Sequence, residues 1–181
     1  SGLIASKIAS TLSSVGAPSF SISANDCSHG DLGSITKKDI LILISNSGNS
    51  SELKNIIQYA NRYKIKLICI VSKKNSILYR SSDIKLLIPE TKEAGFGLVP
   101  TTSTSVQLSL GDALAISVMK YKKFSQLDFK RYHPGGSLGK KLQTVEDLML
   151  TKNKIPFIDE QKTISQGLKV INLKKLGVLI T

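Results

Sequence analysis

The fold of this chain is decided by one stretch of its sequence, Asp39-Ile-Leu-Ile-Leu-Ile-Ser-Asn-Ser-Gly-Asn-Ser-Ser-Glu52. Residues 40–44 form an unbroken apolar run, which is typical of a strand buried on both faces of a sheet. Hydroxyl, amide and glycine residues follow, and a helical pattern opens at Glu52. A polar turn between a strand and a helix is the geometry that binds anions, because free backbone N–H groups and the positive end of the helix dipole converge there.

Two interpretations of this polar turn are open from its residues alone. In the first, Gly48 lets the backbone approach a phosphate without an intervening Cβ, and the small hydroxyl side chains add donors. In the second, the turn is an ordinary strand-to-helix connection in which Ser50 or Ser51 is only an N-cap. Because serine caps are common, the stretch alone favours neither interpretation.

Strand and helix patterns alternate along the rest of the chain. The expected strands cover residues 19–23, 40–44, 66–72 and 84–88, and the expected helices cover residues 3–12, 51–63, 77–80, 101–121 and 125–131. This alternation predicts an α/β fold, a three-layer doubly wound sandwich with a mostly parallel sheet, as in flavodoxin-like proteins. Ligands bind at the carboxyl ends of the strands in such sheets, so we expect the loops of His29, Asn46, Glu93 and Thr101 to meet at that edge.

Helical spacing also predicts which residues are buried. The helix over 51–63 should bury Leu53, Ile56, Ile57 and Ala60. The first helix should bury Leu3, Ile4, Ile8 and Leu12, and the helix over 101–121 should bury Val106, Leu110, Ala113, Leu114 and Val118.

Composition limits the classes of partner. The formal charge of +12 comes from scattered lysines with no interleaved aromatic residues, so a solvated surface that attracts a small anion is favoured over nucleic-acid binding. No apolar run approaches the ~20 residues of a membrane span. The two isolated cysteines, Cys27 and Cys69, and the lack of a signal-peptide pattern predict a cytoplasmic protein without a disulfide framework. No His/Cys cluster has the spacing of metal ligands.

The pattern restarts at Val145. A short strand at 157–158, a helix over 163–173 and a strand at 178–180 form a segment below the ~40 residues that an unaided domain needs. We therefore expect one domain over residues 1–144 and an incomplete second domain over residues 145–181.

Four side chains are candidates for acid–base chemistry: His29, His133, Glu52 and Glu93. Loop histidines beside glycines are often structural, and exposed glutamates are mostly solvated, so none is decisive alone. With the polar turn, the set suggests general acid–base catalysis on a small phosphorylated molecule. The hydroxyl cluster at residues 101–105 is either a helix cap with surplus hydroxyls or a second wall of the anion site.

In this order the motifs resemble the sugar isomerase (SIS) family, and more narrowly its arabinose-5-phosphate isomerases. The matching segments are Ser1-Gly2, His29-Gly-Asp-Leu-Gly33, Ser45-Asn-Ser-Gly-Asn-Ser-Ser-Glu52, Lys92-Glu-Ala94, Leu98-Val-Pro-Thr-Thr-Ser103, Gly111-Asp-Ala-Leu-Ala115 and His133-Pro-Gly-Gly-Ser-Leu-Gly139. The resemblance covers residues 1–144. The tail from Val145 resembles the start of a cystathionine-β-synthase (CBS) domain.

The resemblance implies a cofactor-free interconversion of D-ribulose 5-phosphate and D-arabinose 5-phosphate, which feeds 3-deoxy-D-manno-octulosonate and lipopolysaccharide synthesis. It implies Glu93 as the first candidate for the carbon base, Glu52 as its rival, and His133 and His29 near the substrate oxygens. It also implies self-association, as a homotetramer. The residues implied for phosphate binding are Ser1, Ser45, Asn46, Ser47, Ser50, Thr101, Thr102, Ser103 and Thr104.

Three departures from the family pattern bear on activity. Family members have Gly-x-Gly-Lys on a first strand before the residue that matches Ser1, so we expect a chain that starts at Ser1 to be impaired or inactive. Asn49 stands where relatives commonly have glutamate, at a position that we do not regard as catalytic. The CBS-like segment stops after one β-α-β unit and cannot form a nucleotide-binding pair.

Two other functions stay open. The same turn would suit an isomerase of another sugar phosphate, because a phosphate turn does not recognise the sugar. It would also suit a non-catalytic sugar-phosphate sensor. The two glutamates and two histidines favour the enzyme, since a sensor does not need them.

Overall fold

Three parallel strands form the sheet of the N-terminal part of the chain. Their order is β1 (Ile40–Ile44), β2 (Lys66–Val71) and β3 (Ile84–Leu87), with Ile40 opposite Lys66 and Ile68 opposite Ile84. All three strands therefore end at the same edge of the sheet. The predicted strands at 40–44, 66–72 and 84–88 are confirmed.

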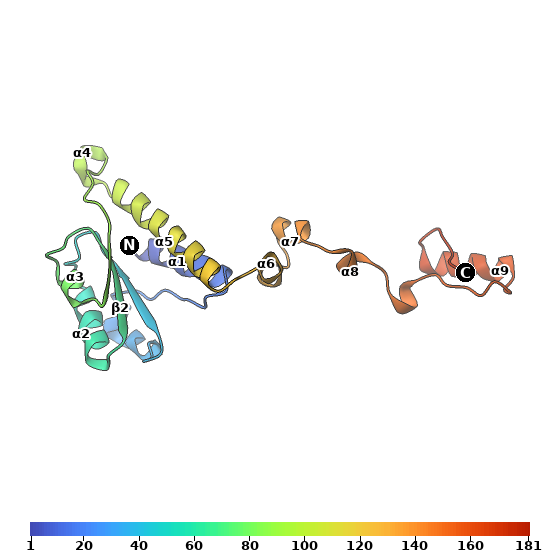
Figure 1. The fold of residues 1–181 in the computed structure, drawn as a ribbon, viewed down its shortest axis with the longest axis horizontal. Helices are drawn as coiled ribbons and strands as arrows, with labels where there is room; N and C mark the ends of the chain where they lie inside the picture. The colour runs from blue at the N-terminus through green and yellow to red at the C-terminus, as the bar shows by residue number, and fades with distance from the viewer. The chain divides into compact units, whose positions relative to one another are not determined.

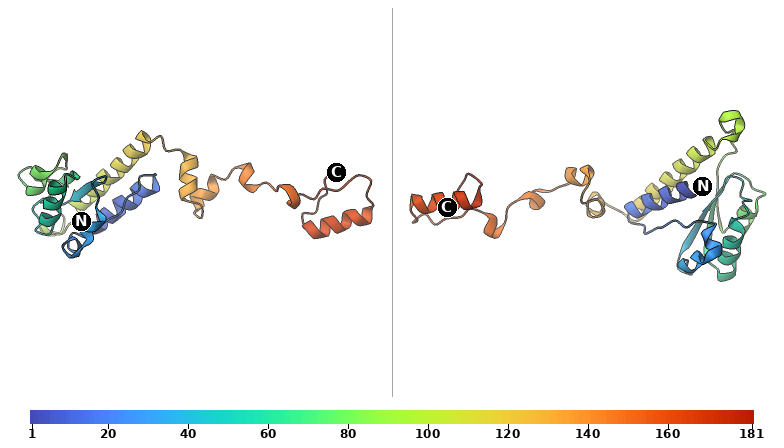
Figure 2. Two further views of the ribbon diagram at one scale, coloured as in Figure 1. Left: turned by 90° about the horizontal axis from the view of Figure 1, so that it is seen from below. Right: turned by 180° about the vertical axis from the view of Figure 1, so that it is seen from behind.

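Helices cover both faces of this sheet (Figures 1 and 2). Helices α1 (Gly2–Ser14) and α5 (Thr102–Tyr121) lie on one face, and α2 (Leu53–Tyr63), α3 (Ile77–Ser81) and the 3₁₀-helix η1 (Asp26–His29) lie on the other. Side chains of β1 alternate between the two cores, with Leu41 and Leu43 facing α2, and Ile42 and Ile44 facing α1 and α5. The predicted three-layer α/β fold is confirmed.

The structure is a computed structural model that describes residues 1–181, apart from the side chain of Leu138. The chain divides into two units, Ser1–His133 and Pro134–Thr181. The first also contains η2 (Asp31–Ser34), α4 (Gly95–Leu98) and α6 (Gln126–Tyr132). The second contains α7 (Ser137–Lys141), α8 (Val145–Leu148), η3 (Lys152–Lys154) and α9 (Ile164–Lys174), with a parallel bridge between Phe157 and Ile180. The domain boundary at residue 144 and the CBS assignment remain predictions.

Four predicted details are wrong. The segment 19–23 forms no strand in the described chain; Ser19 instead exchanges bonds with the Ser13 hydroxyl. Leu3 is 89% exposed at the start of α1. At 157–158 and 178–180, the two expected strands reduce to the single bridge. Helix α5 buries Ser103, Gln107, Gly111 and Ala115 instead of the predicted stripe.

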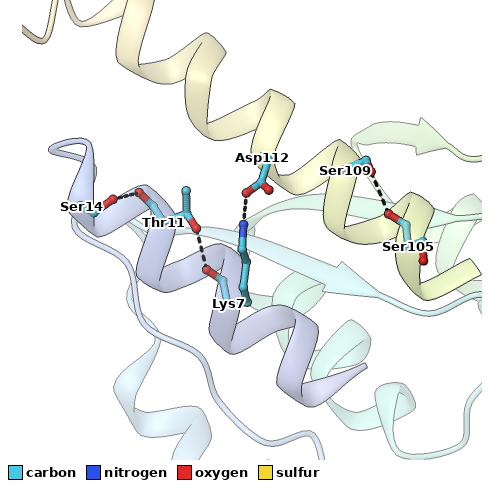
Figure 3. Close-up of polar contacts among 6 residues, drawn as sticks. All are labelled: Lys7, Thr11, Ser14, Ser105, Ser109 and Asp112. Atoms are coloured by element: carbon cyan, nitrogen blue, oxygen red, sulfur yellow. Dashed lines mark hydrogen bonds and ion pairs between the residues drawn. The ribbon is translucent and has the colours of Figure 1, made fainter. Parts of the chain in front are cut away.

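The α1–α5 contact explains this shifted stripe. Gly111 lies directly against Ile8, so small and polar residues of α5 face α1, while Val106, Leu110 and Val118 are only partly buried beside the sheet. Figure 3 shows the neighbouring ion pair between Lys7 and Asp112, which links the two helices at the surface. Close approach of two helices favours small side chains at the crossing, which hydrophobic spacing does not report.

We expect Gly111→Ala to destabilise the protein by about 1–3 kcal/mol, the usual cost of overpacking a core. A Cβ at this position would lie 2.3 Å from Cγ1 of Ile8, so one helix must move. Urea denaturation measures the change. Gly2→Ala is the control because a Cβ there meets nothing within 4 Å; equal stability of the two variants would contradict the close contact.

Candidate functional site

The polar turn after β1 is held together by its own serines. The Ser45 side chain is buried, and its Oγ accepts a hydrogen bond from the Gly48 N–H at 3.1 Å. The same oxygen lies 3.1 Å from Oγ of Ser50, so the two hydroxyls tie the start of the turn to its end. Ser47 is exposed, and its Oγ accepts a bond from the Asn49 N–H at 3.3 Å. Of these hydroxyls, that of Ser47 is the most open to a ligand.

The start of α2 leaves backbone donors unused. No side chain caps α2, because the Ser50 hydroxyl bonds Ser45 and the Ser51 hydroxyl bonds Glu52, so the interpretation as a serine-capped turn is wrong. Among the described residues, the N–H groups of Ser47, Ser50, Ser51 and Glu52 donate to no protein acceptor. Unpaired N–H groups at the positive end of an 11-residue helix are a ready site for an anion.

Glu93 is bound to the N-terminus of α5. Its Oε2 accepts bonds from the N–H groups of Thr101 at 2.9 Å and Ser103 at 3.2 Å. Bonds from the Ser103 side chain and the Thr101 backbone lower the pKa of the Glu93 carboxyl to about 2. Glu93 therefore takes the place of an N-cap for α5, and a carboxylate held in this way is a weak base.

This bonding predicts loss of stability in acid. The ordinary pKa of the carboxyl is 4.5 and the folded pKa is about 2. The folded state therefore releases the proton more readily, and the stabilisation by Glu93 is present above pH 4.5 and lost as pH falls toward 2. We expect Glu93→Gln to be less stable than wild type at pH 7 and to lose less stability between pH 4.5 and 2 in thermal melts.

Asp31→Asn is the control for this acid series because it removes an exposed carboxylate of the same unit. Its pH profile should follow that of wild type. A Glu93→Gln profile parallel to wild type across the whole window would contradict the assigned cause.

The hydroxyl cluster at the start of α5 is largely occupied by local bonds. Oγ1 of Thr101 donates to the Val99 carbonyl and accepts from the Ala94 N–H, and the hydroxyls of Thr104 and Ser105 donate to the Thr101 carbonyl. These contacts fix the loop over 94–101 against α5. The cluster acts first as the frame of this loop, and its role as an anion wall remains a prediction.

A hollow of about 740 Å³ brings three of the predicted site residues together. It lies along β1, between α1 and the segment 17–25, and its lining includes Ser1, Ser50 and Glu52. Glu93 belongs to the loop that leaves the sheet after β3, and it is bonded to the start of α5. Of the two glutamates, Glu52 is the one that lines the hollow with the turn.

The structure does not bring His133 to this hollow. Its ring stacks on Phe129 with centroids 3.8 Å apart, and its Nδ1 lies 2.9 Å from the Phe129 carbonyl. Helix α6 before it packs through Tyr132 and Phe124 near Gly16, beyond the end of α1 opposite to Ser1. His133 and the polar turn of one chain are therefore at opposite ends of α1, which has 13 residues and is roughly 20 Å long.

His29 lies nearer to α2. It ends η1 and is exposed, and η1 is joined to α2 by a bond from the Asn55 amide to the Ser28 hydroxyl at 3.0 Å. His29 therefore lies on the α2 face of the sheet. In the described structure it forms no hydrogen bond or ion pair with Glu52 or Glu93.

Sequence reasoning missed the supports of the turn. The Ser72 hydroxyl donates to the Asn46 carbonyl of the turn, and the Asn49 side chain joins the turn to α3. Neither residue was predicted as a functional residue. A signal was present, because Ser72 opens a polar segment directly after β2, as Ser45 does after β1.

In the described part of the chain, no three His, Cys, Asp or Glu side chains gather as metal ligands would. None of its helices combines the length and apolar character needed to cross a bilayer. Cys27 and Cys69 are buried free thiols, and burial raises the pKa of Cys27.

These features define a three-layer α/β protein with an uncapped helix N-terminus at the carboxyl edge of a parallel sheet. The chain belongs to the SIS domain family, whose model matches residues 1–117.

Individual relatives agree with this membership. An uncharacterized protein of Rickettsia prowazekii is 42% identical over 177 residues, which are 98% of this chain and 56% of the relative. Arabinose 5-phosphate isomerase KdsD of Yersinia pestis is 43% identical over 182 residues, which are 99% of this chain and 56% of the relative. The chain thus spans about half the length of the curated relatives it matches.

A solved structure is also similar to this chain. A protein of E. coli CFT073 in complex with A5P has a TM-score of 0.72 at 41% identity, over 74% of this chain and 72% of that one.

Proposed function

We propose that the protein is a sugar-phosphate isomerase that interconverts D-ribulose 5-phosphate and D-arabinose 5-phosphate. The observation that carries this proposal is the group of unpaired N–H donors at Ser47 and Ser50–Glu52, which offers a phosphate site beside a carboxylate. The curated relative named arabinose 5-phosphate isomerase and the similar structure that holds A5P support the choice of sugar. The pathway proposed for the product is 3-deoxy-D-manno-octulosonate and lipopolysaccharide synthesis, in the cytoplasm.

The reaction needs one carbon base and help at two oxygens. The base takes the proton from C-2 of the aldose, next to the C-1 carbonyl, and the C–H electrons form the double bond of an enediolate. Return of the proton to C-1, with transfer of the hydroxyl proton from O-2 to O-1, gives the ketose. The phosphate takes no part in these steps, and binding it fixes C-1 and C-2 relative to the base.

We assign the carbon base to Glu52 rather than to Glu93. Glu52 lines the hollow with Ser50, whereas Glu93 is committed to α5 and has a pKa of about 2, far below the range that suits a base at neutral pH. Sequence resemblance ranked Glu93 first, and that ranking remains to be tested. In the present proposal Glu93 holds the loop over 94–101 and the start of α5.

The remaining roles are also proposals. His29 and His133 would act at the substrate oxygens, and the distance of His133 from the turn in one chain supports delivery by another subunit of a homotetramer.

Isomerisation assays of the intact protein, expressed from its own gene, test the proposal. D-arabinose 5-phosphate should give D-ribulose 5-phosphate, and hexose 6-phosphates should react at least about tenfold more slowly. Faster conversion of another sugar phosphate would identify that sugar as the substrate instead. Binding without conversion of any sugar phosphate would identify a sensor and refute the isomerase.

A further inference from the structure

The polar turn is hydrogen-bonded to the segment that follows β2, which includes Ser72 and α3. The Asn46 carbonyl accepts bonds from the N–H of Ser72 at 3.0 Å and from its Oγ at 2.7 Å. The Gly48 carbonyl accepts a bond from the Leu78 N–H at 3.0 Å. In a trans peptide the C=O and the following N–H point in opposite directions. The unpaired N–H of Ser47 and the N–H of Asn49, which bonds the Ser47 hydroxyl, therefore point away from β2 and α3. Their orientation is set by where the two carbonyls bind.

The Asn49 side chain completes this attachment. Its Oδ1 accepts a bond from the N–H of Ile77, the first residue of α3, at 2.9 Å. The next donors of α3 are also used, with the Leu78 N–H on Gly48 and the Tyr79 N–H on the capping Ser76 hydroxyl. A helix start needs acceptors for its first N–H groups. Two of these acceptors, Oδ1 of Asn49 and the Gly48 carbonyl, belong to the polar turn. The same two bonds fix the turn to α3.

Packing leaves this contact little freedom. Ser76 is fully buried, and a Cβ on Gly48 would lie 2.3 Å from its Oγ and 2.6 Å from Cγ2 of Val71. The turn therefore rests directly on α3 and the end of β2. A loss of the Asn49 bond cannot be compensated by a closer approach of the two segments.

We propose that Asn49 is a positioning residue of the phosphate site, which acts through α3 without touching the substrate. This inference rests on the proposed function, because phosphate is the group that the turn is proposed to hold. Its amide oxygen is used by Ile77, so its effect on a ligand passes through the backbone of residues 46–49. The Ser72 hydroxyl does the same from the other side of the turn.

Asn49→Ala tests the inference in the intact protein. Its affinity for inorganic phosphate, measured by calorimetry, should fall about tenfold, the effect of one lost neutral hydrogen bond. The KM for D-arabinose 5-phosphate should rise by a similar factor while kcat changes less than about twofold, because the base is untouched. Ser72→Ala should change both quantities in the same direction, and it carries the test if Asn49→Ala does not fold.

Asn61→Ala is the matched control. It removes another exposed amide, near the C-terminal end of α2 and outside the turn, so its phosphate affinity and KM should equal those of wild type. Wild-type affinity in Asn49→Ala, or a fall in kcat at constant KM, would overturn the inference. A wild-type protein that binds phosphate but isomerises no sugar would refute the proposed function alone, whereas one that binds no phosphate would refute both.

Discussion

Glu52→Gln should lower kcat for isomerisation of D-arabinose 5-phosphate on the order of 10³-fold, within the range that general base catalysis contributes. The amide keeps the size of the side chain but cannot accept the proton from C-2. Because Glu52 has no bond to the core of the fold, melting temperature and phosphate affinity should stay close to wild type. Initial rates with purified variants measure the effect.

Two further variants make this result specific. Glu90→Gln removes another exposed carboxylate at the same sheet edge, one that pairs with Lys73, and it should keep near-normal activity. Glu93→Gln should lose activity less than Glu52→Gln, because we assign it a supporting role. A severe loss in Glu93→Gln together with near-normal Glu52→Gln would restore Glu93 as the carbon base.

Gly48→Ala should lower the free energy of unfolding by about 2–4 kcal/mol. This range adds the cost of a non-glycine residue in the left-handed region to the cost of an overpacked contact. The backbone of Gly48 has φ of +67°, and an added Cβ would collide with Ser76 and Val71. Phosphate binding should fall with stability, since the turn must leave α3 to relieve the collision. Urea denaturation and phosphate calorimetry measure the two effects.

Gly33→Ala is the control for this substitution. Gly33 lies in the 3₁₀-helix η2 of the same unit, its φ is not left-handed, and a Cβ there meets nothing within 4 Å. It should be as stable as wild type. Normal stability and phosphate affinity in Gly48→Ala would contradict the close contact of Gly48 with Ser76 and Val71.

Much of this fold could be predicted because apolar runs and helical spacing report burial directly. The run at residues 40–44 gave a strand whose side chains alternate between two cores, and α2 buries the four predicted residues. The failures occur where another contact overrides local pattern. The α1 crossing at Gly111 shifted the buried stripe of α5, and the segment 19–23 found hydroxyl partners in α1 instead of a strand.

The residue types of the site could be predicted from the sequence, but most of its hydrogen bonds could not. Hydroxyl, glycine and glutamate residues after a buried strand indicated an anion-binding turn, and the absence of a side-chain cap on α2 agrees with that interpretation. Spacing could not reveal that Glu93 binds the start of α5, because Thr101 lies eight positions further along the chain, beyond α4. It also could not reveal that Asn49 reaches a helix 28 positions away in the chain.

Proton exchange tests the central claim most directly. D-arabinose 5-phosphate is incubated in heavy water with the intact protein, and the C-2 proton is followed by nuclear magnetic resonance. An enediol mechanism predicts that this signal disappears as solvent deuterium enters carbon, and that Glu52→Gln suppresses the exchange while still binding phosphate. Conversion to the ketose with full retention of the original proton, or tight binding with no exchange in wild type, would contradict the account.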